Sequence, residues 1–293
     1  MDTAFHFAKI YLEITNCCNL HCRFCPGTTR PRHFLSLEEF AVLAGKLRSH
    51  SDYLYLHVMG EPLLHPDLAE ILRICEDLHF RVILTTNGTL LREKEELLLS
   101  SPALYKVNIS LHSFEGNEGN SNFTADDYFD SCFTFADHAS AKGILCIFRL
   151  WNEKSAALPQ LKPKNRQNDA ILTRLQSAFP DPWTKNTKGY RIRHRLHIEW
   201  DEIFAWPDLA APFSMESHGC YALRDHIAVL CDGSVIPCCL DSEGTLTLGN
   251  LFREDLPEIL ASPRANAIRE GFRQGNAAEN LCRRCGYAAR FAK

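Results

Sequence analysis

Short runs rich in β-branched and aromatic residues alternate along most of this chain with longer amphipathic stretches. This alternation predicts an α/β protein built from repeated βα units around a mainly parallel sheet, because a crossover between parallel strands is long enough to hold a helix. Six strands are expected, at residues 9–15, 53–59, 81–86, 106–112, 144–150 and 192–200. Helices are expected between and around them, at residues 37–48, 66–78, 93–99, 126–141 and 169–178.

The expected strands have one polar and one apolar face, because successive side chains of a strand point to opposite sides. The polar face is formed by Glu13, Thr15, His57, Met59, Glu61, Asn108, Ser110 and His112. We expect a curved wall with helices on its apolar side and a polar cavity on the other, arranged as a partial (β/α)6 barrel. A sheet with one solvated face is the alternative.

The alternating pattern of strands and helices ends after Trp206-Pro207. Residues 152–190 are polar and proline-containing, and they predict one helix between loops. Residues 226–239 predict two short strands around the turn Asp232-Gly233, followed by a helix at 256–272 and a cysteine-rich tail. We therefore expect a core domain at residues 1–205 and a smaller domain at 206–293, with a β-hairpin and a helix.

Charge and composition exclude several classes of function. Lys plus Arg total 32 against 36 Asp plus Glu, and the net charge of -4 predicts neither a nucleic acid nor a membrane partner. No apolar run approaches the roughly 20 residues of a membrane span, and the first residues lack the pattern of a secretory signal, so a cytoplasmic protein is expected. In that compartment, thirteen cysteines are expected to be metal ligands, reactive groups or buried thiols rather than disulfides.

A first thiol motif follows the first expected strand, with the spacing Cys18-x3-Cys22-x2-Cys25. Three thiolates in one loop can bind three irons of a [4Fe-4S] cubane and leave the fourth iron open. A structural zinc ion would need a fourth ligand, for which His21 or Cys17 is available.

This motif resembles that of the radical S-adenosylmethionine (radical SAM) superfamily, in which an aromatic residue, here Phe24, precedes the last cysteine. Gly60-Glu61-Pro62 resembles the family's Gly-Gly-Glu segment, which binds the ammonium group of the cofactor, although Met59 replaces the first glycine. Three further family positions match in order along the chain: Asn87 within Thr85-Thr86-Asn87-Gly88, Ser110 and Arg149. Each of the three also has an ordinary structural explanation. Asn87 before Gly88 is typical of a turn, a serine within a strand usually has no functional role, and an arginine at a strand end usually lies at the surface or in an ion pair.

The resemblance implies a chemistry and its cofactors. The open iron would chelate S-adenosylmethionine (SAM), whose reductive cleavage gives a 5'-deoxyadenosyl radical that abstracts hydrogen from a substrate. Phe24, Gly60, Glu61, Asn87 and Ser110 would then contact the cofactor. An external one-electron donor, such as flavodoxin or ferredoxin, is the implied partner.

A second thiol set occupies the C-terminal part. Cys220, Gly233, Cys238, Cys282 and Cys285 resemble the twitch domain, a shortened SPASM domain that binds one auxiliary [4Fe-4S] cluster through four cysteines. Cys239 is an alternative to Cys238, and a structural zinc ion is an alternative to the cluster. The other cysteines, Cys17, Cys75, Cys132, Cys146 and Cys231, are expected to be structural.

The cysteine spacing is most similar to that of the aminocyclitol (2-deoxy-scyllo-inosamine) dehydrogenases. Their chemistry needs a proton acceptor, for which Arg149, His112, Glu199 and, less directly, His197 are candidates. One strand face would carry Arg191, Arg193, Arg195, His197 and Glu199. That face either binds an anionic substrate or only carries edge-strand charges.

A small polar substrate, undergoing dehydrogenation or lyase chemistry, is expected. A peptide-modifying enzyme is disfavoured, because only about ten residues precede the first strand, and a non-catalytic iron-sulfur or zinc protein is the third hypothesis.

Overall fold

The computed structural model describes residues 5–116, 124–153, 165–213 and 219–291. Its centre is one eleven-stranded sheet with the order β11-β10-β9-β1-β2-β3-β4-β5-β8-β7-β6. The strands are β1 (Lys9–Leu12), β2 (Tyr53–Tyr55), β3 (Arg81–Thr86), β4 (Leu104–Ser110), β5 (Leu145–Glu153), β6 (Thr184–Lys185), β7 (Gly189–Arg193), β8 (Leu196–Glu202), β9 (His226–Val229), β10 (Ser234–Ile236) and β11 (Gly249–Asn250). The seven central strands, from β9 to β8, pair in parallel, and the strands at both ends pair antiparallel.

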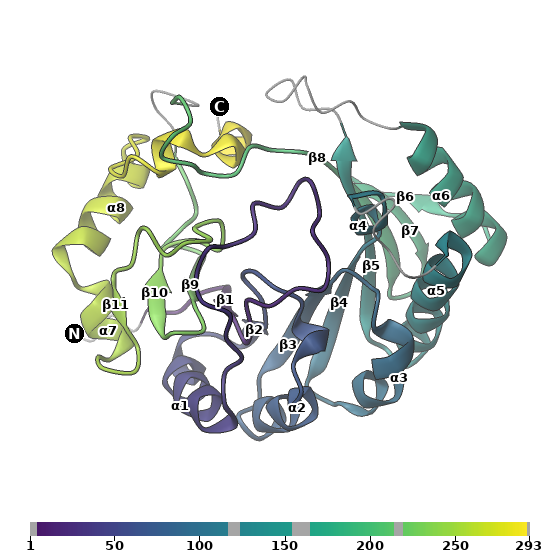
Figure 1. Cartoon of the computed structure of the whole chain (residues 1–293), viewed down its shortest axis with the longest axis horizontal. Helices are drawn as coiled ribbons and strands as arrows, with labels where there is room; N and C mark the ends of the chain where they lie inside the picture. Colours follow the sequence, from purple (N-terminus) through teal and green to yellow (C-terminus); the bar gives the residue numbers. More distant parts are fainter. Residues whose placement is uncertain (1–4, 117–123, 154–164, 214–218, 292–293) are drawn as a thin grey trace.

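The sheet curves into an open wall, with helices along its outer side (Figure 1). The helices are α1 (Leu37–Leu47), α2 (Leu68–Asp77), α3 (Leu91–Ser100), α4 (His112–Gly116), α5 (Ala125–Ala141), α6 (Asn165–Ala178), α7 (Leu256–Leu260) and α8 (Pro263–Arg273). Short 3-10 turns lie at η1 (Arg48–His50), η2 (Pro62–Leu64), η3 (Cys282–Arg284) and η4 (Gly286–Phe291). The predicted α/β class with a mainly parallel, unclosed sheet is confirmed.

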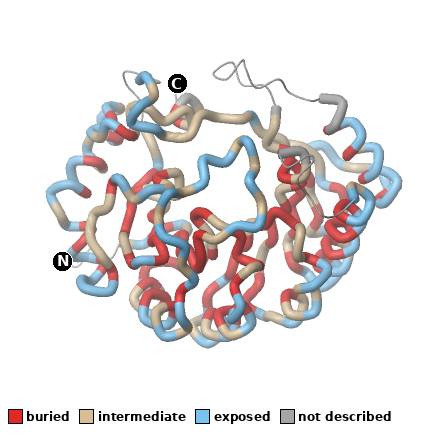
Figure 2. Tube along the Cα trace, in the orientation of Figure 1, coloured by how far each residue is buried: buried red, intermediate tan, exposed pale blue. Residues whose placement is uncertain are grey.

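Local sequence signals start several of these helices. Ser36 accepts a hydrogen bond from Glu39 N, and the Glu39 carboxylate accepts one from Ser36 N, which together form the capping box of α1. The Thr124 side chain caps α5 by accepting a hydrogen bond from Asp127 N. The outward strand residues, among them Leu54, Val107 and Phe148, are fully buried against the helices (Figure 2). The apolar faces predicted from strand alternation therefore form the core.

The second half of the sheet differs from the prediction at residues 192–200. One strand was expected there, but β7 and β8 form an antiparallel hairpin in which Arg195 adopts a left-handed conformation at φ 60°. The single strand face proposed for Arg191, Arg193, Arg195, His197 and Glu199 is therefore wrong for two of them: Arg191 is the register partner of His197, but a register shift puts Arg193 opposite Leu196, and Arg195 lies in the turn. Arg193 instead bonds to Asp137 O on α5 at 2.7 Å.

The C-terminal region continues the same sheet. The hairpin around Asp232-Gly233 is confirmed, and β9 pairs in parallel with β1, with Lys9 opposite His226. The single helix expected at 256–272 is wrong: α7 and α8 are separate, because Pro263 lacks a backbone N–H and Ser262 caps a new helix through Ala265 N.

The polar segment at residues 152–190 also contains more secondary structure than expected. It contains α6 and adds the short strand β6, which the sequence did not indicate. Pro159 and Pro163 lie outside the described residues. Among the described residues, every helix is too short or too polar to cross a lipid bilayer.

Candidate functional site

The three cysteines of the first motif, Cys18, Cys22 and Cys25, lie on the long loop between β1 and α1, which crosses in front of the curved sheet (Figure 1). Cys18 and Cys25 are exposed, and Cys22 is half-buried. Cys25 N donates to Cys22 O at 3.0 Å, which closes a tight turn around two of the thiols. Partial burial, with smaller contributions from Glu61, Cys22 and Cys25, raises the pKa of Cys18 to about 11. Such thiols lose their protons when a metal binds, so the donor set fits an iron-sulfur cluster.

Gly60 brings the segment after β2 into close contact with this loop. Its φ is +76°, and a Cβ atom there would lie 2.5 Å from Thr15 O and 2.8 Å from Cys17 O. Glu61 N donates to Cys17 O at 2.8 Å. Glycine is needed here both for its backbone conformation and for the missing side chain.

Glu61 has an extended backbone, with φ -119° and ψ 110°, as is usual for a residue that precedes proline. Its buried carboxylate accepts hydrogen bonds from Leu63 N at 3.0 Å and Asn87 N at 2.7 Å. Burial raises the pKa of Glu61 to about 7, against the opposing effect of these bonds. The carboxylate therefore ties the end of β2 to the end of β3, and its remaining lone pairs are available to a cation.

The loop after β3 extends this arrangement to Cys18. Asn87 Nδ2 donates to Asn19 Oδ1 at 2.9 Å and lies 4.0 Å from Cys18 Sγ. Asn19 in turn donates to Thr89 Oγ1 at 2.9 Å. Tyr128 OH donates to Asn87 O at 2.7 Å, so the backbone of this loop is held from α5 as well. The structure thus brings together Cys18, Glu61 and Asn87.

Phe24 and His112 meet on the other side of the loop. Their ring centroids are 4.7 Å apart, and Trp206 Nε1 donates to Phe24 O at 3.0 Å. His112 was expected to end a strand, but it begins α4, where Nδ1–H donates to Arg149 O at 3.0 Å. Burial lowers the pKa of His112 to about 4, so the ring is neutral at pH 7 with Nε2 as its acceptor.

Arg149 and Glu199 lie side by side on the inner face, as register partners of β5 and β8. Ser110 is the partner of Arg149 on β4. The Arg149 guanidinium stacks on Trp151 at 4.4 Å from the ring centroid, and its buried Nε has no hydrogen-bond partner among the described residues. Burial lowers the pKa of Arg149, while Tyr11, Glu199 and Tyr55 act in the opposite direction. Two of the four predicted proton acceptors, Arg149 and Glu199, therefore face the concave side of the sheet.

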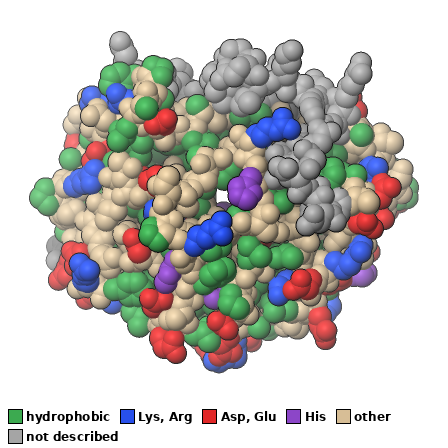
Figure 3. All heavy atoms as spheres, viewed as in Figure 1, with side chains coloured by type: hydrophobic (Ala, Val, Ile, Leu, Met, Phe, Trp, Pro, Cys, Tyr) green, Lys and Arg blue, Asp and Glu red, His purple; other side chains and the backbone are tan. Residues whose placement is uncertain are grey.

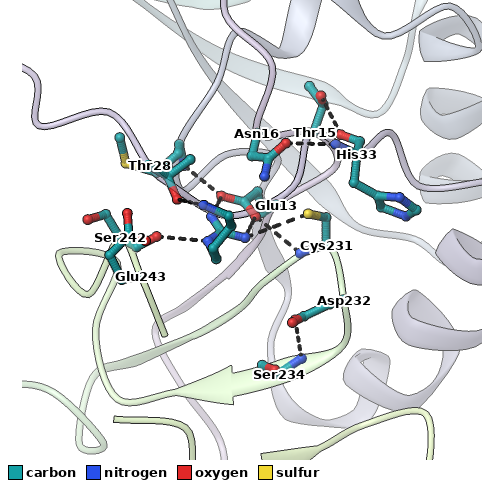
Figure 4. Close-up of polar contacts among 12 residues, drawn as sticks. Glu13, Thr15, Asn16, Thr28, His33, Cys231, Asp232, Ser234, Ser242 and Glu243 are labelled. Carbon is teal, nitrogen blue, oxygen red and sulfur yellow. Dashed lines mark hydrogen bonds and ion pairs between the residues drawn. The ribbon is translucent and has the colours of Figure 1, made fainter. Parts of the chain in front are cut away.

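Glu13, predicted to line the polar cavity, is instead fully buried and paired with Arg30. The two carboxylate oxygens lie 2.7 and 2.8 Å from Arg30 Nη2 and Nη1. Cys231 N donates a hydrogen bond to the Glu13 carboxylate, and Arg30 Nε donates one to Ser242 O. The cysteine loop is therefore bonded to the C-terminal region (Figure 4). Sequence reasoning missed Arg30, because its partner is 17 residues away.

The second thiol set lines one cavity of about 170 Å³ between β9–β10 and the C-terminal turns. Its walls include Cys220, Cys238, Cys239, Cys282 and Cys285. Thiolates are the usual ligands of an iron-sulfur cluster, and the cysteines of this one cavity include the four that one cluster needs.

Two family models match this sequence. The radical SAM superfamily matches residues 12–144, and the SPASM iron-sulfur cluster-binding domain matches residues 220–286. The chain contains a radical SAM domain and a SPASM region. The first domain implies a [4Fe-4S] cluster and SAM, and the second implies auxiliary iron-sulfur binding.

Curated relatives of this protein include GTP 3',8-cyclases. A probable GTP 3',8-cyclase of Saccharolobus islandicus is 33% identical over 122 residues, which cover 41% of this chain and 39% of that protein. The GTP 3',8-cyclase of Chlorobaculum tepidum is 26% identical over 209 residues, covering 67% and 63%. The matches thus span less than two thirds of the length of these relatives.

Solved structures share the fold of this protein. BtrN in complex with AdoMet and 2-DOIA has a TM-score of 0.62 at 18% identity, covering 95% of this chain and 92% of that one. Streptococcus suis SuiB bound to precursor peptide SuiA has a TM-score of 0.60 at 17% identity, covering 97% and 70%. At these identities the likeness concerns the fold.

Proposed function

We propose that this protein is a radical SAM enzyme that abstracts hydrogen from a small polar metabolite held on the concave face of its sheet. The observation that carries the proposal is the contact of the Cys18, Cys22 and Cys25 loop with Glu61 and Asn87, directly beside that face. The reaction class is dehydrogenation or a lyase step, and the cytoplasm is the proposed location.

Cys18, Cys22 and Cys25 hold the first cluster in this proposal. When bound, that cluster supplies the electron that cleaves SAM into methionine and a 5'-deoxyadenosyl radical. Glu61 offers carboxylate lone pairs to the ammonium group of SAM. Gly60 and Asn87 lie in the segments after β2 and β3, and Ser110 ends β4. Phe24, within the cysteine loop, packs on His112.

The substrate side of the site belongs to β5 and β8. Arg149 and Glu199 are the groups in reach of a substrate on the inner face, and one of them takes the proton that leaves a hydroxyl group. Burial lowers the pKa of Arg149, but a guanidinium keeps its proton in a protein, so Glu199 takes the proton and Arg149 orients the hydroxyl group. Neutral His112 positions this strand through its bond to Arg149 O.

Cys220, Cys238, Cys282 and Cys285 hold the auxiliary cluster in the cavity that they line. An external one-electron donor, such as flavodoxin or ferredoxin, supplies reducing equivalents. The auxiliary site lies next to the concave face, because Lys9, Tyr11 and Trp151 also line its cavity. That position suits an electron acceptor for a substrate radical.

A nucleotide is the second candidate substrate. It is favoured by the match to the GTP 3',8-cyclase of Chlorobaculum tepidum, which extends over 209 residues of alignment. A precursor peptide, as in the SuiB complex, is the remaining alternative.

The test is anaerobic reconstitution followed by reduction with dithionite in the presence of SAM. We expect about eight irons per chain and release of 5'-deoxyadenosine, detected by mass spectrometry. Alanine at Cys18, Cys22 or Cys25 should abolish that release. Cys17→Ala is the matched control, because it removes a neighbouring thiol of the same loop, and it should retain both iron and cleavage. A wild-type protein that loads only zinc, or loads iron without cleaving SAM, contradicts the proposal.

A further inference from the structure

Three cationic side chains share the concave face of the sheet. Lys9, Lys106 and Arg149 come from β1, β4 and β5. Their strand neighbours Ile10, Val107 and Phe148 are fully buried on the opposite, helix-covered face. Because side chains alternate along a strand, the three cations point away from the helices and into the concavity. Figure 3 shows a small opening near the middle of the face seen there, with His and Lys or Arg side chains beside it.

These cations are not neutralised by ion pairs. Among the described residues, no carboxylate lies within 4.0 Å of any of the three. The Lys9 ammonium instead lies 5.4 and 5.5 Å from the ring centroids of Tyr11 and Tyr55. The nearby carboxylate of Glu13 is already paired with Arg30, and Glu199 is the register partner of Arg149 alone.

The cations also repel one another. Burial, followed by the charge of Arg149, lowers the pKa of Lys106 to about 8, and Lys9 acts in the same direction. Gathering positive charges in a partly buried place costs free energy, which an anion bound between them would recover.

Two buried nitrogen atoms on this face have unfilled hydrogen-bonding capacity. Arg149 Nε and His57 Nδ1 have no partner among the described residues. His57 lies beside the tyrosines that Lys9 contacts, with its ring centroid 5.5 Å from that of Tyr11. Buried polar atoms are rarely left unsatisfied, so these two point to a ligand on the concave face.

We propose that the concave face binds an anionic group of the substrate, a phosphate or a carboxylate, through Lys106 and Arg149, with Lys9 adding to the positive field. Arg149 offers a planar set of donors suited to either anion, and Lys106 offers a mobile point charge. The inference rests on the proposed function, because it assumes that the substrate occupies this face. It narrows the substrate class to small molecules that carry at least one negative charge.

The test is calorimetric titration of the anaerobically loaded full chain, with SAM present, by inorganic pyrophosphate and separately by succinate. We expect one saturable site for at least one of them, and the better ligand identifies the anion as phosphate or carboxylate. Lys106→Met should weaken that binding by about tenfold or more, and Lys106→Arg should restore part of it. Lys94→Met on the outer helix α3 removes the same charge and should bind like the wild type.

Absence of binding by both anions, or equal affinity of wild type and Lys106→Met, would overturn the anion site. SAM cleavage by the same wild-type preparation is measured in parallel. If anions bind but SAM is not cleaved, the proposed function fails and the anion site stands. If SAM is cleaved but neither anion binds, the anion site fails alone.

Discussion

Arg30 and Glu13 form a two-point ion pair, with nitrogen-oxygen distances of 2.7 and 2.8 Å, between the cysteine loop and the end of β1. The Glu13 carboxylate also accepts hydrogen bonds from Met59 N and Cys231 N, at 3.0 and 3.1 Å. One buried carboxylate therefore joins the loop, the segment after β2 and the β9–β10 hairpin. The position of the first cluster ligands depends on this junction.

Arg30→Met should destabilise the protein by about 3 kcal/mol, because it leaves a buried carboxylate without its cation. The urea midpoint of the loaded full chain measures this loss. Arg73→Met is the control: it removes an arginine whose ion pairs with Glu70 and Asp77 are exposed, and it should barely move the midpoint. Equal shifts in the two variants would show that the Glu13 junction contributes no more than a surface pair.

Gly60→Ala should cost about 2 kcal/mol or more and weaken SAM binding, because its Cβ atom would meet Thr15 O and Cys17 O in a left-handed backbone. Gly143→Ala is the matched control. It shares a positive φ, at +87°, but a Cβ atom there meets nothing within 4 Å. Its cost should be about 1 kcal/mol, with SAM affinity unchanged. The comparison uses thermal unfolding and SAM titration of both variants.

Cys238→Ala should leave about four irons per chain after reconstitution, whereas Cys239→Ala should leave about eight. Both thiols line the auxiliary cavity, and Leu240 N donates to Cys238 Sγ at 3.5 Å. Iron and sulfide analysis with electron paramagnetic resonance of the reduced protein provides the measurement. The reverse pattern would transfer the ligand role to Cys239.

Because of Lys106, the free energy of unfolding should change with pH in the alkaline range. Its folded pKa of about 8 lies below that of an unfolded lysine, so between those values the unfolded chain binds more protons. The contribution of Lys106 to stability therefore rises with pH above 8, and its penalty is fully present below 8. Burial is the largest cause of this lowered pKa; Arg149, Lys9 and Lys188 lower it further, and Glu199 raises it.

The measurement is the difference in urea midpoint between Lys106→Met and wild type, without added anion. Lys106→Met should be more stabilising at pH 7.5 than at pH 10, because the replaced ammonium is charged only at the lower value. Other alkaline titrations affect both proteins and cancel in the difference. A difference that does not change with pH would show that Lys106 is as solvated as a surface lysine.

Local features of this protein follow from short stretches of sequence. The capping box at Ser36, the Asp232-Gly233 turn and the extended backbone of Glu61 each depend on residues within a few positions of one another. The alternation of apolar residues in the strands likewise identified the buried face, since every second side chain meets the helices. Strand alternation was sufficient for the α/β class, and the spacing Cys18-x3-Cys22-x2-Cys25 indicated the family.

Tertiary structure alone decided the rest, because it depends on which distant surfaces meet. Arg30 finds its partners at Glu13 and at Ser242, 212 residues away, and no local pattern marks that contact. A hairpin that turns at Arg195 is found where one long strand was expected, because the backbone N–H and C=O groups of β7 are paired with those of β8 and β6. The cationic concave face likewise exists only because β1, β4 and β5 curve toward one another, which brings side chains from three separate segments around one space.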